Sequence, residues 1–139
     1  MKTNLDLAHL LIRKAESDLA AVHRTITSEG PYDTGLFHCQ QAVEKYLKAL
    51  LAVHNINYPK IHDVTVLAEL GEPFCPALSS LSFSLAEFNP FAVTIRYDDL
   101  DLDHEHSLPL LQEMLEKADQ VRTIILNVLP EEIRPLTYK

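Results

Sequence analysis

The stretch GLFHCQQAVEKYLKALLAVHNINYPKIHDV, residues 35–64, decides the fold class. Its apolar residues recur every three or four positions as far as His54, which is the period of one face of an α-helix. We expect a helix that Asp33 or Thr34 caps and that ends near His54, followed by a loop and a short helix capped by Asp63. The core face of the long helix is predicted to consist of Leu36, Cys39, Val43, Tyr46, Leu47 and Leu50.

The other side of this helix carries a polar stripe, which consists of Gln41, Glu44, Lys45 and Lys48. At 100° per residue these four side chains gather in roughly a quarter of the circumference. Glu44 and Lys48 are four positions apart in the favourable order for an ion pair. An exposed stripe with one ion pair would contribute on the order of a few tenths of a kcal/mol. The same residues also form a candidate ligand site, and the spacing leaves both interpretations open.

Two further polar residues lie close to the stripe. Gln40 falls at the edge of the apolar face, and because a buried amide must find partners, we expect it to bond to a neighbouring helix or loop. His62 directly precedes the Asp63 cap and is expected to face the bundle, where it would bind a backbone carbonyl or a carboxylate. A structural and a catalytic role are both open for this single histidine.

The remaining helical patterns predict an all-α fold. A first helix is expected from Thr3 or Asn4 to about Thr27, a third substantial helix over residues 77–89, and a last long helix from about Ser107 to Leu129. Mostly short connections favour an up-and-down antiparallel bundle of four main helices plus one or two short helices. We expect one domain over residues 1–130 and a C-terminal tail over residues 131–139.

Composition narrows the function classes. A chain of 139 residues, 47% hydrophobic, fits one ordered domain, and a formal charge of −8 argues against a general basic surface for nucleic acid. The first residues carry charges throughout and no apolar run reaches the ~20 residues of a membrane span, so we expect a cytoplasmic protein. Cys39 and Cys75 form no motif and are expected to be free thiols, buried or half-buried, as a reducing compartment allows.

The segment RYDDLDLDHEH, residues 96–106, is the most charged part of the chain. Its alternating aspartates fail the calcium-loop pattern, because His104 and Leu110 stand where Gly and Glu are needed. His104 and His106 alone do not define a transition-metal site, and no zinc spacing occurs, so we predict neither a metal nor a cofactor. Arg96 is able to hold a phosphate in a planar fork or to pair with Asp98 or Asp99.

Several of these segments together resemble the HEPN family of helical domains. The similarity is carried by YDTGLFHCQQAVEKYLKALL (32–51), YPKIHDVTVLAEL (58–70), IRYDD (95–99) and LIRKAESDLAAV (11–22). The resemblance implies a bundle of four or five helices that commonly dimerises and is often encoded beside a minimal nucleotidyltransferase, as in toxin–antitoxin-like pairs. It also implies a nucleotide-binding role. Many members are RNA endonucleases that use an Arg followed four to six residues later by a His.

The chain departs from that nuclease pattern. After Arg96 the next histidine is His104, with seven residues between, and the other arginines also lack a histidine at the right distance. We therefore favour a non-catalytic homodimer that binds a nucleotide or phosphate ligand, a nucleotidyltransferase partner, or both. One alternative is a divergent ribonuclease toxin that uses Arg96 with His104 or His106; another is a purely structural dimerisation module. The predicted ligand-binding residues are Gln41, Glu44, Lys45, Lys48, His62 and Arg96.

Overall fold

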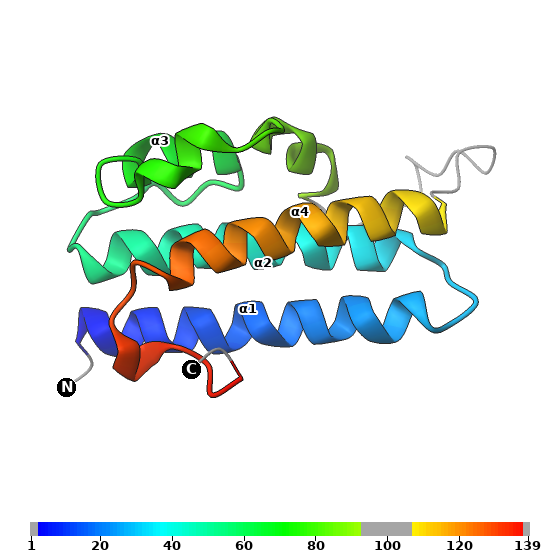
Figure 1. Ribbon diagram of the computed structural model, residues 1–139, viewed down its shortest axis with the longest axis horizontal. Coiled ribbons are helices and arrows are strands. Elements are labelled where there is room, and N and C mark those ends of the chain that lie inside the picture. The colour runs from blue at the N-terminus through cyan, green and yellow to red at the C-terminus, as the bar shows by residue number, and fades with distance from the viewer. Residues whose placement is uncertain (1–2, 93–106, 138–139) are drawn as a thin grey trace.

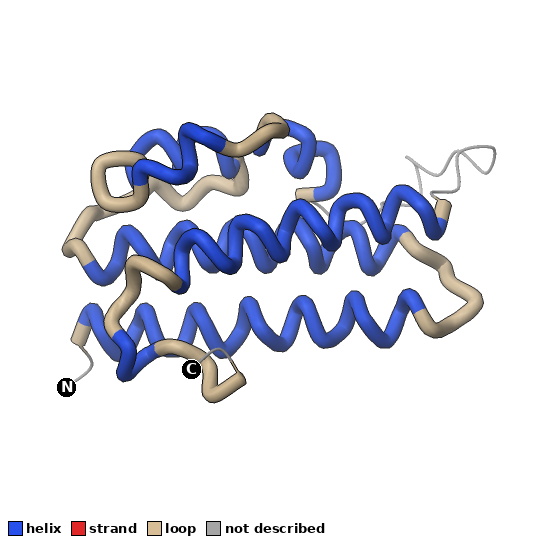
Figure 2. Tube along the Cα trace, viewed as in Figure 1, coloured by secondary structure: helices blue, strands red, loops and turns tan. Residues whose placement is uncertain are grey.

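The computed structural model describes residues 3–92 and 107–137 and is all-α over these ranges, without a strand (Figures 1 and 2). This confirms the predicted fold class. The α-helices are α1 (Asn4–Ile26), α2 (Asp33–Val53), α3 (Val64–Gly71) and α4 (Leu108–Leu126). Over the same ranges, three 3₁₀ helices accompany them: η1 (Pro76–Ser80), η2 (Leu85–Phe91) and η4 (Glu131–Ile133).

Helix α2 lies at the centre of the bundle. It packs against α1, α3, α4 and η2, and in Figure 1 it runs between α1 on one side and the α3 segment on the other. All six residues of the predicted core face are fully buried, which confirms that face. Burial continues around the rest of the helix, however, because neighbours cover it on several sides.

Local signals set the ends of the first two helices. Thr3 caps α1 in a capping box: its Oγ accepts a bond from the Asp6 backbone N–H, and the Asp6 carboxylate accepts one from the Thr3 N–H. The predicted bounds of α1 are thus confirmed. The predicted cap of α2 is wrong, because Tyr32 occupies the cap position without a side-chain bond. Asp33 instead lies in the first turn, where its charge favours the helix dipole.

The continuous helix predicted over residues 77–89 is wrong. The structure has η1 and η2 there, separated at Leu81 by extended backbone. Serine side chains bond to nearby backbone groups and so compete with a helix: Ser79 Oγ donates to the Pro76 carbonyl, and Ser84 caps η2. Leu78, Leu85 and Phe88 are still buried, so the apolar period predicted the core contacts but not the helix type.

Helix α4 begins after a Ser107 cap and ends at Leu126, three residues before the predicted end. The chain then turns back along α1, where Ile133 of η4 is buried. Arg134 donates to the backbone carbonyls of Leu129 and Asn127, just beyond the end of α4. The first residues of the predicted tail therefore pack on the bundle. The domain boundary at residue 130 stays a prediction.

Both cysteines are free and buried, as predicted. Within the described ranges no helix combines the length and the apolar character that a membrane crossing requires.

Gly35 allows α2 and α4 to approach closely, and this generates a stability prediction. A Cβ at Gly35 would lie 2.8 Å from Leu111 Cδ2 and 2.9 Å from Cδ1, and Leu111 is fully buried. Alanine in a helix gains about 1 kcal/mol over glycine, but overpacking costs about 1–3 kcal/mol. We expect Gly35→Ala to lower the free energy of unfolding by about 1 kcal/mol in urea denaturation.

The control shortens the opposing side chain. In a Leu111→Val background the added methyl has room, so Gly35→Ala should become neutral or stabilising there. A Gly35→Ala variant that is more stable than the wild type in the native background would contradict this account of the α2–α4 contact.

Candidate functional site

The polar stripe of α2 is not an exposed face. Glu44 is buried, with 4% exposure, and Gln41, Lys45 and Lys48 are only partly exposed. Helix α1 covers the stripe from one side, and the loop that ends at His62 covers it from the other, because both contribute partners to its side chains. The interpretation as a solvated stripe is therefore wrong, since helical spacing shows which side chains share a face but not what packs upon it.

Glu44 is the centre of a hydrogen-bonded network, hereafter the Glu44 network, formed with Gln40, Gln41, Lys48 and His62. One carboxylate oxygen accepts bonds from His62 Nδ1 at 2.8 Å and Gln40 Nε2 at 3.1 Å, and the other accepts from Lys48 Nζ at 3.0 Å. Gln40 Nε2 also donates to the His62 carbonyl at 3.1 Å, and Gln41 Nε2 donates to Gln40 Oε1 at 2.7 Å. The expected partners of Gln40 and His62 are confirmed.

The charge on Glu44 is stabilised where it lies. Burial alone would raise the pKa of this carboxyl, but the hydrogen bonds from His62, Gln40 and Lys48 outweigh that effect and hold the pKa below its ordinary value. Next to it, the Lys48 ammonium lies 5.7 Å from the centre of the Tyr58 ring. Desolvation and the charge of Glu44 together raise the pKa of the Tyr58 hydroxyl. The network is thus an ionised cluster beside an aromatic ring.

Lys45 belongs to a second cluster, hereafter the Asp18 network, with Asp18 and His38. Asp18 of α1 is 7% exposed, and its two oxygens contact His38 Nδ1 at 2.8 Å and Lys45 Nζ at 2.6 Å. The arrangement repeats that of Glu44, because each buried carboxylate bridges one imidazole and one ammonium. His38 joins Gln41, Lys45 and Lys48 at helical spacing, so both networks lie along the same side of α2.

Sequence reasoning missed Asp18 and His38. A signal was present: Asp18 lies among Ala15, Leu19 and Val22 in the buried period of α1, where a carboxylate requires a partner. His38 is three positions before Gln41 and so extends the polar stripe by one turn.

A third cluster joins α1, α2 and α4. Arg122 donates to Glu16 through Nε at 2.7 Å and through Nη2 at 2.9 Å, and the Tyr46 hydroxyl donates to the same carboxylate. Bidentate pairing of this kind is strong and fixes the guanidinium in one plane. The hydrogen bonds and charge of Glu16 accordingly raise the pKa of Arg122 above its ordinary value. Arg122 is engaged in holding the helices together.

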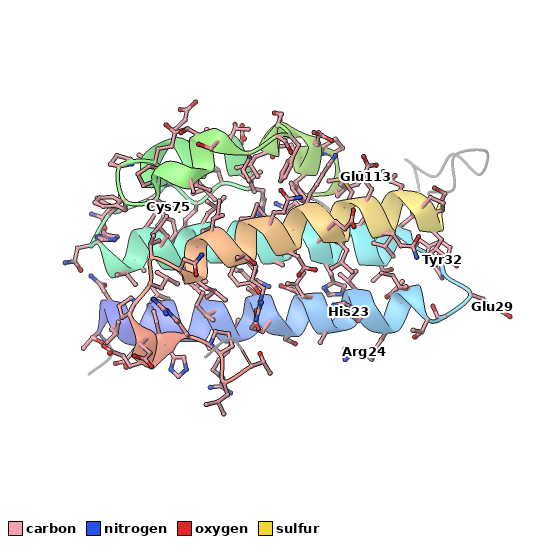
Figure 3. The ribbon with its side chains drawn as sticks, viewed as in Figure 1. His23, Arg24, Glu29, Tyr32, Cys75 and Glu113 are labelled. Carbon is pink, nitrogen blue, oxygen red and sulfur yellow. The ribbon has the colours of Figure 1, made fainter. Side chains whose placement is uncertain are left out.

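The adjacent pair His23 and Arg24 does not form a site. In Figure 3 His23 lies on the side of α1 that faces α4, and Arg24 points away from the bundle. Toward α4, His23 acts electrostatically on Asp119, whose pKa is raised by desolvation despite the opposing charges of His23 and Arg122. Consecutive helical residues diverge by about 100°, which explains the separation.

The other predicted residues fall outside the described ranges. Arg96, His104 and His106 lie between residues 93 and 106. Phosphate binding by Arg96 and the nuclease alternative therefore stay predictions. Within residues 3–92 and 107–137 no group of three or more His, Cys, Asp or Glu side chains is arranged to hold a metal ion.

Comparison with known families identifies the bundle. The family model described as HEPN domain matches residues 8–129, which is nearly the whole chain. This match confirms the resemblance that the sequence segments carry. Neither the curated proteins nor the solved structures include a significant match to the chain.

The buried charge of Glu44 generates a pH prediction. We expect Glu44→Gln to lower the free energy of unfolding at pH 7 by about 2 kcal/mol, because Lys48 and His62 lose an ionised partner. The pKa of Glu44 is lowered in the folded state, so its stabilisation is present above the unfolded pKa and is lost as the pH falls through the folded one. The difference between variant and wild type in urea denaturation should therefore shrink as the pH is lowered from about 4.5.

Glu113→Gln is the matched control. Glu113 pairs with Lys117 on the exposed side of α4, so its replacement should change stability by less than about 1 kcal/mol. A Glu44→Gln deficit that stayed constant down to pH 3 would contradict the assignment of a folded-state pKa below the ordinary value.

Proposed function

Since the chain belongs to the HEPN domain family, we propose that it is a non-catalytic member that dimerises and binds a nucleotide or related phosphate ligand along α2. A minimal nucleotidyltransferase is its proposed partner, in a toxin–antitoxin-like pair. The ligand site consists of the polar stripe with His62, and Arg96 completes the predicted set from outside the described ranges. The observation that carries the proposal is the pair of half-buried lysines, Lys45 and Lys48, on the same side of one helix.

The lysine chemistry supports phosphate binding. An ammonium has three N–H donors, and the described hydrogen bonds use one from Lys45 and one from Lys48. The remaining donors are available to phosphate oxygens. Gln41 adds an amide beside them, and the His62 side chain is 60% exposed, which leaves an imidazole edge at the surface of the same cluster.

The aromatic surface supports a nucleotide in particular. The Tyr58 ring is half-buried and lies beside Lys48, so a phosphate on the lysine would place the rest of the ligand near an aromatic side chain. Bases stack on such rings for about 1–3 kcal/mol. A phosphate group and a planar base thus both find suitable partners within one cluster.

The described arginines support a non-catalytic role. Phosphodiester cleavage in the family pattern needs an arginine and a histidine at one reacting phosphate. Arg122 is paired with Glu16, Arg134 donates to backbone carbonyls at the end of α4, and Arg24 points away from His23. These three arginines thus have partners or orientations of their own, whereas Arg13 of α1 lines the same groove as His9.

Calorimetry with a panel of nucleotides tests the ligand. We expect saturable binding of at least one nucleotide, and a loss of about tenfold or more in affinity in Lys45→Gln and in Lys48→Gln, because each variant removes a charge-assisted hydrogen bond. Arg24→Gln removes one exposed cation away from the stripe and should bind as the wild type does. Thermal melts of each variant check that the bundle is intact.

The outcomes separate the parts of the proposal. An absence of heat with every nucleotide overturns ligand binding, and equal losses in Lys45→Gln and Arg24→Gln overturn the assignment of the site. Co-purification with a nucleotidyltransferase encoded beside the gene tests the partner, and failure to form that complex overturns the pairing. RNA cleavage by the wild-type protein that depends on Arg96 would replace the non-catalytic role by the nuclease alternative.

A further inference from the structure

Exposed large hydrophobic side chains gather at one end of the bundle. Those of the described residues are Leu5, Leu7, Leu10, Val128 and Leu136. The first three lie in the opening turns of α1, and the other two follow α4, where the chain returns toward the start of α1 (Figure 1). Of these, Leu7 and Leu10 lie about 60° apart on the same side of α1, whereas Leu5 lies about 140° from Leu10.

Leu10 lies on the side of α1 that faces away from the core. The buried residues Ala8, Ile12 and Ala15 point into the bundle, and Leu10 lies roughly opposite them around the helix. We define the outer face of α1 as the exposed residues between 3 and 17 that lie within about 60° of Leu10, namely Thr3, Asp6, Leu7, Leu10, Arg13, Lys14 and Ser17.

The charged side chains of the outer face would match those of a second, identical face. Asp6 lies about one turn before Leu10, and Arg13 and Lys14 lie about one turn after it. When two such helices pack antiparallel with Leu10 against Leu10, the Asp6 of each copy meets the basic pair of the other. This match is a property of a two-fold interface, in which the same patch contacts itself. A parallel pairing would place like charges together.

Hollows in the surface lie on both sides of the outer face of α1. On one side of the outer face, Leu7 lines a hollow of about 220 Å³ together with Asn55 and Tyr58. On the other side, Arg13 lines a groove of about 410 Å³ with residues 133–137. A third hollow, of about 470 Å³, lies on the outer face itself and is lined by Asp6, Leu7, Leu10 and Arg13. Side chains of one copy can enter the hollows of the other when two such helices pack.

From these observations we propose that the outer face of α1 is the surface through which two copies of the chain associate, with antiparallel α1 helices and Leu10 at the two-fold axis. The inference rests on the dimerisation in the proposed function and names its surface and symmetry. The self-matching charges select a second copy as the occupant over an unrelated partner.

Cysteine cross-linking tests the geometry. Leu10→Cys places a thiol at the axis, where it meets its own copy, and the native Cys39 and Cys75 are buried. Ser17→Cys is the matched control on the same face. Seven residues at 1.5 Å each place position 17 about 10 Å along the helix from the two-fold axis, and its copy lies equally far on the other side, so the two sulfurs would be about 20 Å apart. Under mild oxidation of the full-length protein, we expect Leu10→Cys to form a disulfide dimer and Ser17→Cys to stay monomeric on non-reducing gels.

Sedimentation equilibrium of three variants tests the energetics. Leu10→Glu should weaken the dimer at least about 100-fold, because it buries two unpaired carboxylates at the axis. Lys14→Glu should weaken it about tenfold, and Asp6→Lys combined with Lys14→Glu should restore most of that loss. Gln120→Glu adds the same charge to the exposed side of α4 and should leave the dimer unchanged. Circular dichroism melts identify any variant whose fold is lost.

Each result supports or overturns the assignment. Cross-linking of Leu10→Cys alone, with charge restoration, supports it. Equal cross-linking of both cysteine variants overturns the antiparallel geometry. A dimer that tolerates Leu10→Glu and does not cross-link through Leu10→Cys overturns the surface while dimerisation stands. A wild-type chain that is monomeric at all concentrations overturns both the surface and the dimerisation in the proposed function.

Discussion

The buried carboxylate of Glu44 is the constraint to which the neighbouring structure is fitted. A central helix that is covered on several sides has no solvated face, so a charge on it must be matched by protein groups. The loop after α2 turns back to bring His62 to this carboxylate, Gln40 supplies an amide to both, and Lys48 supplies the opposite charge. Asp63, the next residue, caps α3 through the Thr65 N–H. The position of α3 on the bundle is therefore coupled to a single ionised side chain.

The same physical arrangement occurs between α1 and α2 and between α1 and α4. Asp18 joins α1 to α2 through Lys45, and Glu16 joins α1 to α4 through Arg122. Apolar contacts among leucines and alanines tolerate small sliding of one helix along another, but a hydrogen bond of 2.6–2.9 Å does not. The buried polar contacts thus define the register of the helices, and the apolar core supplies most of the stability.

Sequence patterns predicted the features that depend on local periodicity. The core face of α2, the Thr3 and Asp63 caps and the satisfied amide of Gln40 all follow from spacing and side-chain chemistry. Features that depend on distant partners were missed: Glu44 is bonded by His62, eighteen positions later, and the role of His38 needs Asp18, twenty positions earlier. The error over residues 77–89 has a different origin, because serine side chains there compete for backbone groups that a helix would use. The acidic segment with Arg96 lies outside the described residues, so those predictions stand as made.

The contact between Asp18 and Lys45 has a consequence for any anion that binds the stripe. An anion that draws the ammonium of Lys45 toward itself weakens the neutralisation of a carboxylate that is 93% removed from solvent, since Asp18 is only 7% exposed. The contact of His38 Nδ1 with Asp18, at 2.8 Å, is the other described side-chain contact of that carboxylate. An anion on Lys45 would compete with Asp18 for the same ammonium, so its binding would act on the contact between α1 and α2.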